Sequence, residues 1–123
     1  MLETELPADP ASARAARRFV VSALLKLRWD AAAQVAELLV NELVANAVLH
    51  ARSNVVVRVA VDAGTARIEV HDGSRHLATR RDHSVDSTTG RGLGLVADLA
   101  DRWGAEHVGD GKVVWFELED QVR

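Results

Sequence analysis

The hydrophobic pattern of the chain changes its period near residue 52, and this change constrains the fold most strongly. Before it, from about Ala31 to His50, apolar residues recur at the spacing of a buried helix. After it, valines at every second position predict a strand from Asn54 to Asp62 with one face on a core, and a second strand from Ala66 to His71. The glycine at position 64 supplies the turn, so the segment predicts a hairpin that follows a long helix.

An alternating segment and a further helix precede this unit. The stretch LETEL at residues 2–6 alternates as a short strand does. Asp9 and Pro10 then have the types preferred at the N-cap and first position of a helix. This helix is expected from about Ala11 to Leu27, and Asp30 is a second N-cap candidate, for the long helix that follows.

A short helix and a second hairpin are expected after the polar segment 73–90. In GLGLVADLADRWG, the residues Leu95, Leu99 and Trp103 recur every four positions, and Gly104 suits the C-terminal cap. A turn at 109–111 then leads back through KVVWFELE. This order of elements predicts an α/β two-layer sandwich, in which a mixed or antiparallel sheet carries its helices on one face.

Composition narrows the class of protein. The 123 residues are 48% hydrophobic and 27% charged, which suits one globular domain spanning 1–123. A net charge of −3 argues against direct nucleic-acid binding, and the lack of cysteine excludes disulfides and thiolate metal sites. No apolar run is long enough to span a membrane and the acidic start does not resemble a signal peptide, so a cytoplasmic protein without membrane contact is expected.

Polar residues on the long helix form the first candidate site. Glu42, Asn46 and His50 follow one another at intervals of four, which places them along one side of a helix that is otherwise apolar. An asparagine oxygen suits Mg²⁺, and a glutamate one turn earlier can accept a proton during phosphoryl transfer. The alternative is an ordinary polar side of an amphipathic helix.

Two further candidates lie after the hairpin. Asp72 ends a strand and can accept a hydrogen bond from an exocyclic amine such as adenine N6, although Asp-Gly is also a common turn signal. The glycines at positions 90, 92 and 94 in TTGRGLGL allow backbone N–H groups to surround an anion where a helix begins. The alternative is a flexible hinge. The five histidines, two of them at positions 76 and 83, match no zinc-binding spacing.

The order of these motifs resembles the GHKL ATPase superfamily, whose nucleotide site is called the Bergerat fold. NELVANAVLHA is similar to its N box, EVHDGS to its first glycine box and GRGLGL to its second. The closest resemblance is to the anti-sigma-factor serine/threonine kinases of bacterial partner switching and to small actinobacterial ATP-binding regulatory proteins. It covers the chain from Leu6 to Leu118.

The resemblance assigns roles to particular residues. It implies that Glu42 is the general base, that Asn46 holds Mg²⁺ at the nucleotide, and that Asp72 binds the adenine amine. It also implies that the second glycine box closes over the phosphates of ATP through the backbone amides of Gly90, Arg91, Gly92, Leu93 and Gly94. The cofactors expected are therefore ATP and Mg²⁺.

The implied function is phosphorylation of a serine on an anti-anti-sigma protein with a STAS domain, by a kinase that also binds a sigma factor. Arg14, Arg17 and Arg18 on the first helix are candidates for contact with these partners, or else form a solvated helix face. A homodimer is compatible with the resemblance.

Two departures from the family pattern favour an alternative. The first glycine box reads Asp72-Gly73-Ser74 where the family usually has Asp-x-Gly, and Lys112 or Val113 replaces a late threonine. The alternative function is a partner-binding module without catalysis, in which nucleotide binding is weak or structural.

Overall fold

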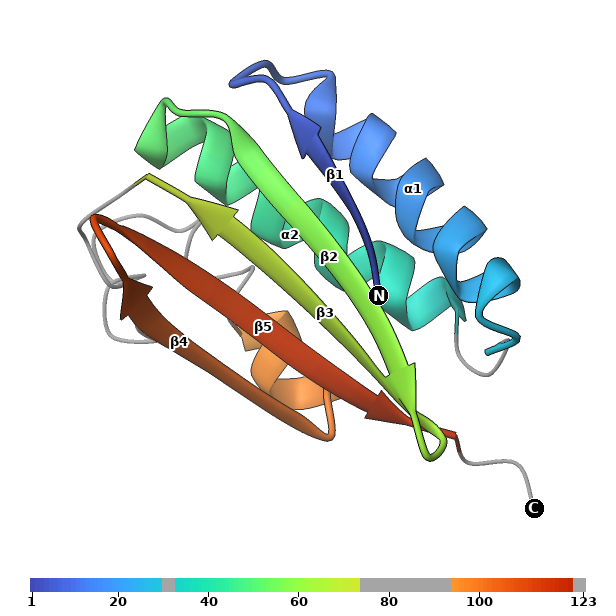
Figure 1. Ribbon diagram of the computed structural model, residues 1–123. Coiled ribbons are helices and arrows are strands. Elements are labelled where there is room, and N and C mark those ends of the chain that lie inside the picture. The colour runs from blue at the N-terminus through green and yellow to red at the C-terminus, as the bar shows by residue number, and fades with distance from the viewer. Residues whose placement is uncertain (30–32, 74–93, 121–123) are drawn as a thin grey trace.

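The computed structural model describes residues 1–29, 33–73 and 94–120. Its elements occur in the order β1 (Leu2–Leu6), α1 (Ser12–Lys26), α2 (Ala33–Ala51), β2 (Val55–Asp62), β3 (Thr65–Asp72), β4 (Arg102–Val108) and β5 (Gly111–Glu119). Residues 94–99 are also helical. Figure 1 shows the two long helices lying side by side across the sheet.

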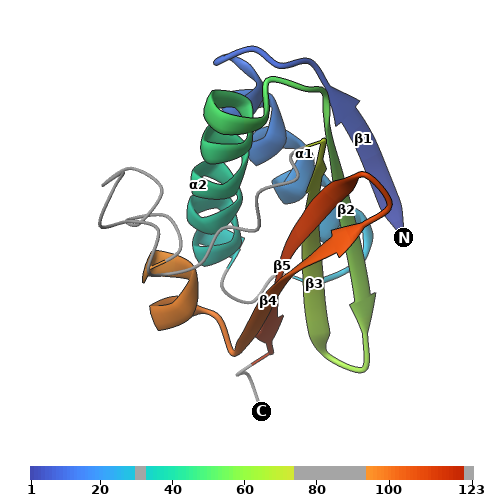
Figure 2. The ribbon, with the colours of Figure 1, turned by 90° about the vertical axis from the view of Figure 1, so that its left-hand side faces the viewer.

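The five strands form one sheet in the order β1-β2-β3-β5-β4, and every pair of neighbours is antiparallel. Figure 2 shows α1, α2 and the helical segment 94–99 on the same side of this sheet. The predicted two-layer α/β sandwich is therefore confirmed, with an antiparallel sheet and its helices on one face. None of the described helices is long and apolar enough to cross a membrane.

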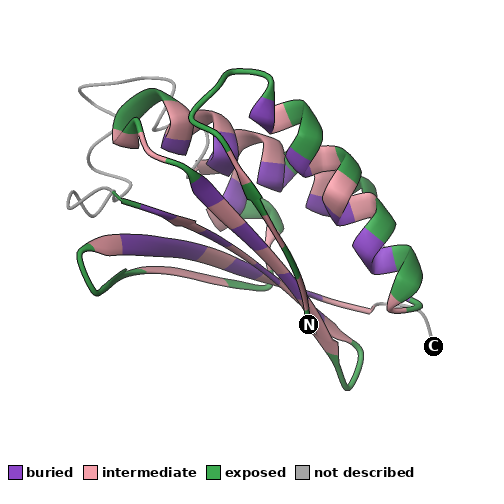
Figure 3. Cartoon of the chain, turned by 45° about the horizontal axis from the view of Figure 1, so that its top comes forward, coloured by how far each residue is buried: buried purple, intermediate pink, exposed green. Residues whose placement is uncertain are grey.

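The core fills the space between the helices and the sheet, as the buried positions in Figure 3 show. The strands contribute through their period of two, because alternate residues point to the same face. In β3 the even-numbered residues, including Ile68 and Val70, are buried, and in β5 Phe116 is fully buried. Residues of α2 such as Leu39 and Val44 cover them from the helix layer.

Two local predictions were wrong near the first and last helices. Asp9 does not cap α1: its carboxylate accepts the backbone N–H of Ala11 at 2.7 Å, two residues on, and α1 begins only at Ser12. Trp103 and Gly104 do not belong to a helix, since both lie on β4 and pair with Phe116 and Trp115 of β5. The N-cap prediction for residue 30 falls outside the described residues.

Gly104 has a packing role in place of the predicted cap. A Cβ atom at this position would lie 2.8 Å from the indole ring of Trp115 on the neighbouring strand. The guanidinium group of Arg67 covers the same ring at 4.0 Å from its centroid. Glycine is therefore needed here because the flat ring lies directly over the backbone of β4.

Candidate functional site

The helix α2 carries the predicted stripe on a partly exposed side. Glu42 and Asn46 are half-buried, whereas His50 in the last turn is exposed. The neighbouring positions Leu43 and Ala47 are buried in the core. The two polar residues therefore lie at the margin of the core, where a side chain can reach a ligand while its stem stays packed.

Asn46 has an unusual environment within this stripe. Its side-chain oxygen Oδ1 is buried and has no hydrogen-bond partner within the part of the chain that the structure describes. A buried acceptor without a partner costs about 1–3 kcal/mol, so proteins rarely retain one without a use. A carbonyl-type oxygen is a good ligand for a hard cation such as Mg²⁺. Asn46 therefore fits the metal ligand that the resemblance implies.

Glu42 is held by a residue that the sequence reasoning did not select. Asn41 donates a hydrogen bond from Nδ2 to Oε2 of Glu42 at 3.2 Å. Asn41 in turn accepts a hydrogen bond at Oδ1 from Nη1 of Arg17 on α1. Of the three arginines expected to face partners, Arg14 and Arg18 are exposed, but Arg17 is half-buried by this contact.

Asp72 lies at the end of β3 on the side of the sheet that the helices cover. It shares a face with the buried residues Ile68 and Val70, and only 9% of it is exposed. The α2 stripe and Asp72 therefore lie on the same side of the sheet. Lys112 on β5 is the register partner of Asp72 and is equally buried.

Two close contacts fix the backbone around Asp72. Gly73 donates its N–H to Oγ of Ser53 at 2.8 Å, which ties the end of β3 to the connection between α2 and β2. A Cβ atom on Gly111 would lie 2.1 Å from the carbonyl oxygen of Asp72, so only glycine fits at the start of β5. The aspartate is thus held by backbone packing.

Of the glycine-rich segment 90–94, Gly94 is the residue that the structure describes. Gly90, Arg91, Gly92 and Leu93 lie outside the described residues, and so do His76 and His83. Gly94 begins the helical segment 94–99, and a Cβ atom there would meet nothing within 4 Å. Within residues 1–29, 33–73 and 94–120, no three His, Asp or Glu side chains gather as a metal site would require.

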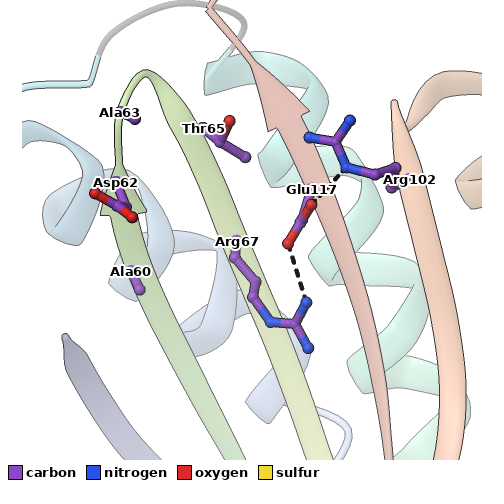
Figure 4. A pocket seen from close by; sticks show the side chains of 7 residues that line it. All are labelled: Ala60, Asp62, Ala63, Thr65, Arg67, Arg102 and Glu117. Carbon is purple, nitrogen blue, oxygen red and sulfur yellow. Dashed lines mark hydrogen bonds and ion pairs between the residues drawn. The ribbon is translucent and has the colours of Figure 1, made fainter.

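The opposite face of the sheet carries a network of charged side chains beside a shallow hollow of about 430 Å³ (Figure 4). Arg102 and Arg67 both bind Glu117, at 2.7 and 3.0 Å. The hydrogen bond from Arg102, with that from Arg67, holds the pKa of Glu117 below its ordinary value although burial opposes this. The arginines are therefore already paired with a carboxylate, and the hollow lies on the side away from Glu42, Asn46 and Asp72.

Comparison with known proteins shows which family the chain belongs to. The profile of the histidine kinase-like ATPase domain matches residues 6–118. A search of curated proteins found no match. Among solved structures, the catalytic domain of histidine kinase ThkA, in a nucleotide-free form, is similar with a TM-score of 0.58 and 17% identity, covering 98% of this chain and 97% of that one.

A second solved structure shows the same similarity of fold. The histidine kinase AdeS of Acinetobacter baumannii is similar with a TM-score of 0.60 and 10% identity, covering 99% of this chain and 69% of that one. At such low identity these likenesses show the fold alone, whereas the profile spans nearly the whole sequence. The resemblance to GHKL ATPases is thereby confirmed, and the chain belongs to the histidine kinase-like ATPase domain family.

Proposed function

We propose that this protein binds ATP with Mg²⁺ and transfers the γ-phosphoryl group to a serine of a STAS-domain anti-anti-sigma protein. The observation that supports the proposal most directly is the buried, unpartnered Oδ1 of Asn46, one helical turn from Glu42. In this assignment Asn46 is the protein ligand of the cation, which supplies charge neutralisation at the phosphate oxygens when bound. Asp72 binds the adenine amine.

Glu42 has the role of general base. Its carboxylate accepts the proton of the serine hydroxyl while the serine oxygen forms a bond to the γ-phosphorus and the bond to the β-phosphate oxygen breaks, releasing ADP. The second glycine box closes over the phosphates through backbone N–H groups. Few side chains are needed, because phosphoryl transfer depends mainly on positioning and on stabilisation of charge.

The proposed kinase acts together with two protein partners, a sigma factor and the STAS protein. The protein would bind a sigma factor in the cytoplasm and release it according to the phosphorylation of the STAS protein. The exposed Arg14 and Arg18 on α1 are candidates for contact with these partners. A homodimer remains part of the proposal.

Replacement of Glu42 by glutamine tests the catalytic role. The purified protein would be incubated with ATP labelled at the γ-phosphate, Mg²⁺ and the STAS-domain proteins of the source organism. Glu42→Gln should reduce transfer by about 100-fold or more while ATP affinity is retained. Glu37→Gln, on the same helix, is the matched control and should transfer normally. Equal rates for the two variants would refute Glu42 as the base.

One observation favours a second function, a partner-binding module without catalysis. Lys112 is the buried register partner of Asp72 on β5, and this second function supposes that its ammonium group takes the place of the adenine amine at that carboxylate. Weak nucleotide binding would follow. Under this alternative the wild-type protein transfers no phosphate, and Lys112→Thr increases its affinity for ATP.

A further inference from the structure

The contact between the two long helices includes a chain of hydrogen bonds that ends at the proposed base. Arg17 reaches from α1 to α2 and donates a hydrogen bond from Nη1 to Oδ1 of Asn41, and Nδ2 of Asn41 donates one to Oε2 of Glu42 at 3.2 Å. The two helices lie side by side in both views of the fold (Figures 1 and 2). Both hydrogen bonds are partly buried, so water competes with them only in part.

The guanidinium group decides which way the Asn41 amide points. Arginine has only hydrogen-bond donors, so the amide must turn its oxygen toward Arg17 and its NH₂ group toward Glu42. Without the arginine the amide can rotate by half a turn. The orientation that turns its NH₂ group toward Glu42 is then no longer held from the side of Arg17, so Asn41 holds the carboxylate less firmly.

The hydrogen bonds from Arg17 through Asn41 determine the position of the Glu42 carboxylate. Neighbouring residues of a helix point about 100° apart and do not face each other, so a hydrogen bond between Asn41 and Glu42 is not a default of helix geometry. Oε2 of Glu42 is engaged in it, whereas Oε1 has no hydrogen-bond partner among the residues that the structure describes. One oxygen is therefore fixed and the other is left to accept a proton.

We infer that Arg17 and Asn41 are positioning residues that hold the Glu42 carboxylate in the orientation needed for proton transfer. The inference rests on the proposed function of Glu42 as a base. Neither residue touches the nucleotide or the serine in this account. Their effect should therefore appear in the rate of the chemical step and leave ATP affinity unchanged.

The kinetic test compares Arg17→Ala, Arg17→Lys and Lys26→Ala, measuring ADP release from Mg²⁺-ATP in the presence of the STAS-domain acceptor protein, and ATP affinity by calorimetry. Lys26→Ala is the matched control, because it removes one positive charge from the exposed end of the same helix. Arg17→Ala should lower kcat about tenfold with KM for ATP unchanged, and Arg17→Lys, which keeps a donor, should recover most of the rate. An unchanged kcat in Arg17→Ala, or an equal loss in Lys26→Ala, would overturn the inference.

A second measurement does not depend on activity. The side-chain NH₂ resonances of Asn41 can be assigned in a ¹⁵N NMR spectrum by their loss in Asn41→Leu. Arg17→Ala and Glu42→Gln should each shift these resonances well beyond the effect of Lys26→Ala. If the wild-type protein turns over no ATP, the proposed function fails by itself, and these shifts still decide the inference: no shift in either variant means that the link does not exist.

Discussion

Replacement of Asn46 by leucine should make the nucleotide-free protein more stable while it removes the proposed metal ligand. Leucine branches at the same atom as asparagine but has no polar oxygen, so the buried and unpartnered Oδ1 disappears. The desolvation cost of such an acceptor is about 1–3 kcal/mol, and leucine adds a few tenths of a kcal/mol in helix propensity. Allowing for imperfect packing of the larger side chain, we expect a gain of about 1–2 kcal/mol.

Urea unfolding without nucleotide measures this gain, and thermal unfolding should show a rise of about 3–5 °C for each kcal/mol in a domain of this size. Calorimetry on the same sample should show that Mg²⁺-dependent ATP binding is lost. Asn41→Leu, on the same helix, is the matched control: it removes the hydrogen bonds that Asn41 makes with Arg17 and Glu42 and should lower stability. An Asn46→Leu protein that is less stable than wild type, or that still binds ATP normally, would refute the reasoning.

Two further predictions concern the sheet. Gly111→Ala should destabilise the protein by about 3 kcal/mol, because its Cβ would lie 2.1 Å from the carbonyl oxygen of Asp72. Gly109→Ala is the control. There φ is +59° and the space is open, so the substitution should cost only about 1 kcal/mol. Urea unfolding that gives equal losses would contradict this difference. The lowered pKa of Glu117 means that its ion pairs with Arg102 and Arg67 stabilise the fold above the ordinary glutamate pKa and are lost as pH falls through the lowered one. Glu117→Gln should therefore lose about 1 kcal/mol at pH 7 and less near pH 3, and a loss that does not change with pH would exclude this role.

The strands that form the central sheet could be predicted because one face of each is buried. Valines at every second position of β2 predict both its existence and its orientation, and β3 continues the same period of two. The position of Asp72 on the helix-covered face follows from the same period of two. These features depend on local sequence, and local sequence is sufficient for them.

The short helix near residue 95 shows where periodicity misleads. Leu95, Leu99 and Trp103 have helical spacing, yet Leu99 is 44% exposed and Trp103 belongs to β4. Pairing with Phe116 on the neighbouring strand overrides the local pattern. Gly104 was misread for a related reason, since a glycine that ends a helix and a glycine beneath an indole ring look the same in a sequence.

The candidate site also combines features that local sequence predicts with features that depend on how distant elements pack. The spacing of Glu42 and Asn46 on one helix is a property of the sequence, and their roles stay predictions until they are tested. The link from Arg17 through Asn41 depends on how α1 packs against α2, over a separation of 24 residues. No local sequence pattern identifies Asn41. Its neighbour Glu42 was identified by its spacing from Asn46, and Asn41 has no such spacing. The residues from 90 to 93, which are predicted to bind the phosphates, lie outside the described residues, so this role also stays a prediction.

The proposed function requires that α2 and the end of β3 form a site for ATP with Mg²⁺. Calorimetric titration of the purified protein with ATP, with and without Mg²⁺ and with GTP as the competing nucleotide, tests it most directly. We expect binding of ATP that requires Mg²⁺, because Asn46 holds the cation, and that exceeds binding of GTP, because Asp72 accepts from the adenine amine. No detectable binding even at millimolar ATP would contradict the proposed function and would leave a partner-binding protein on an ATPase fold.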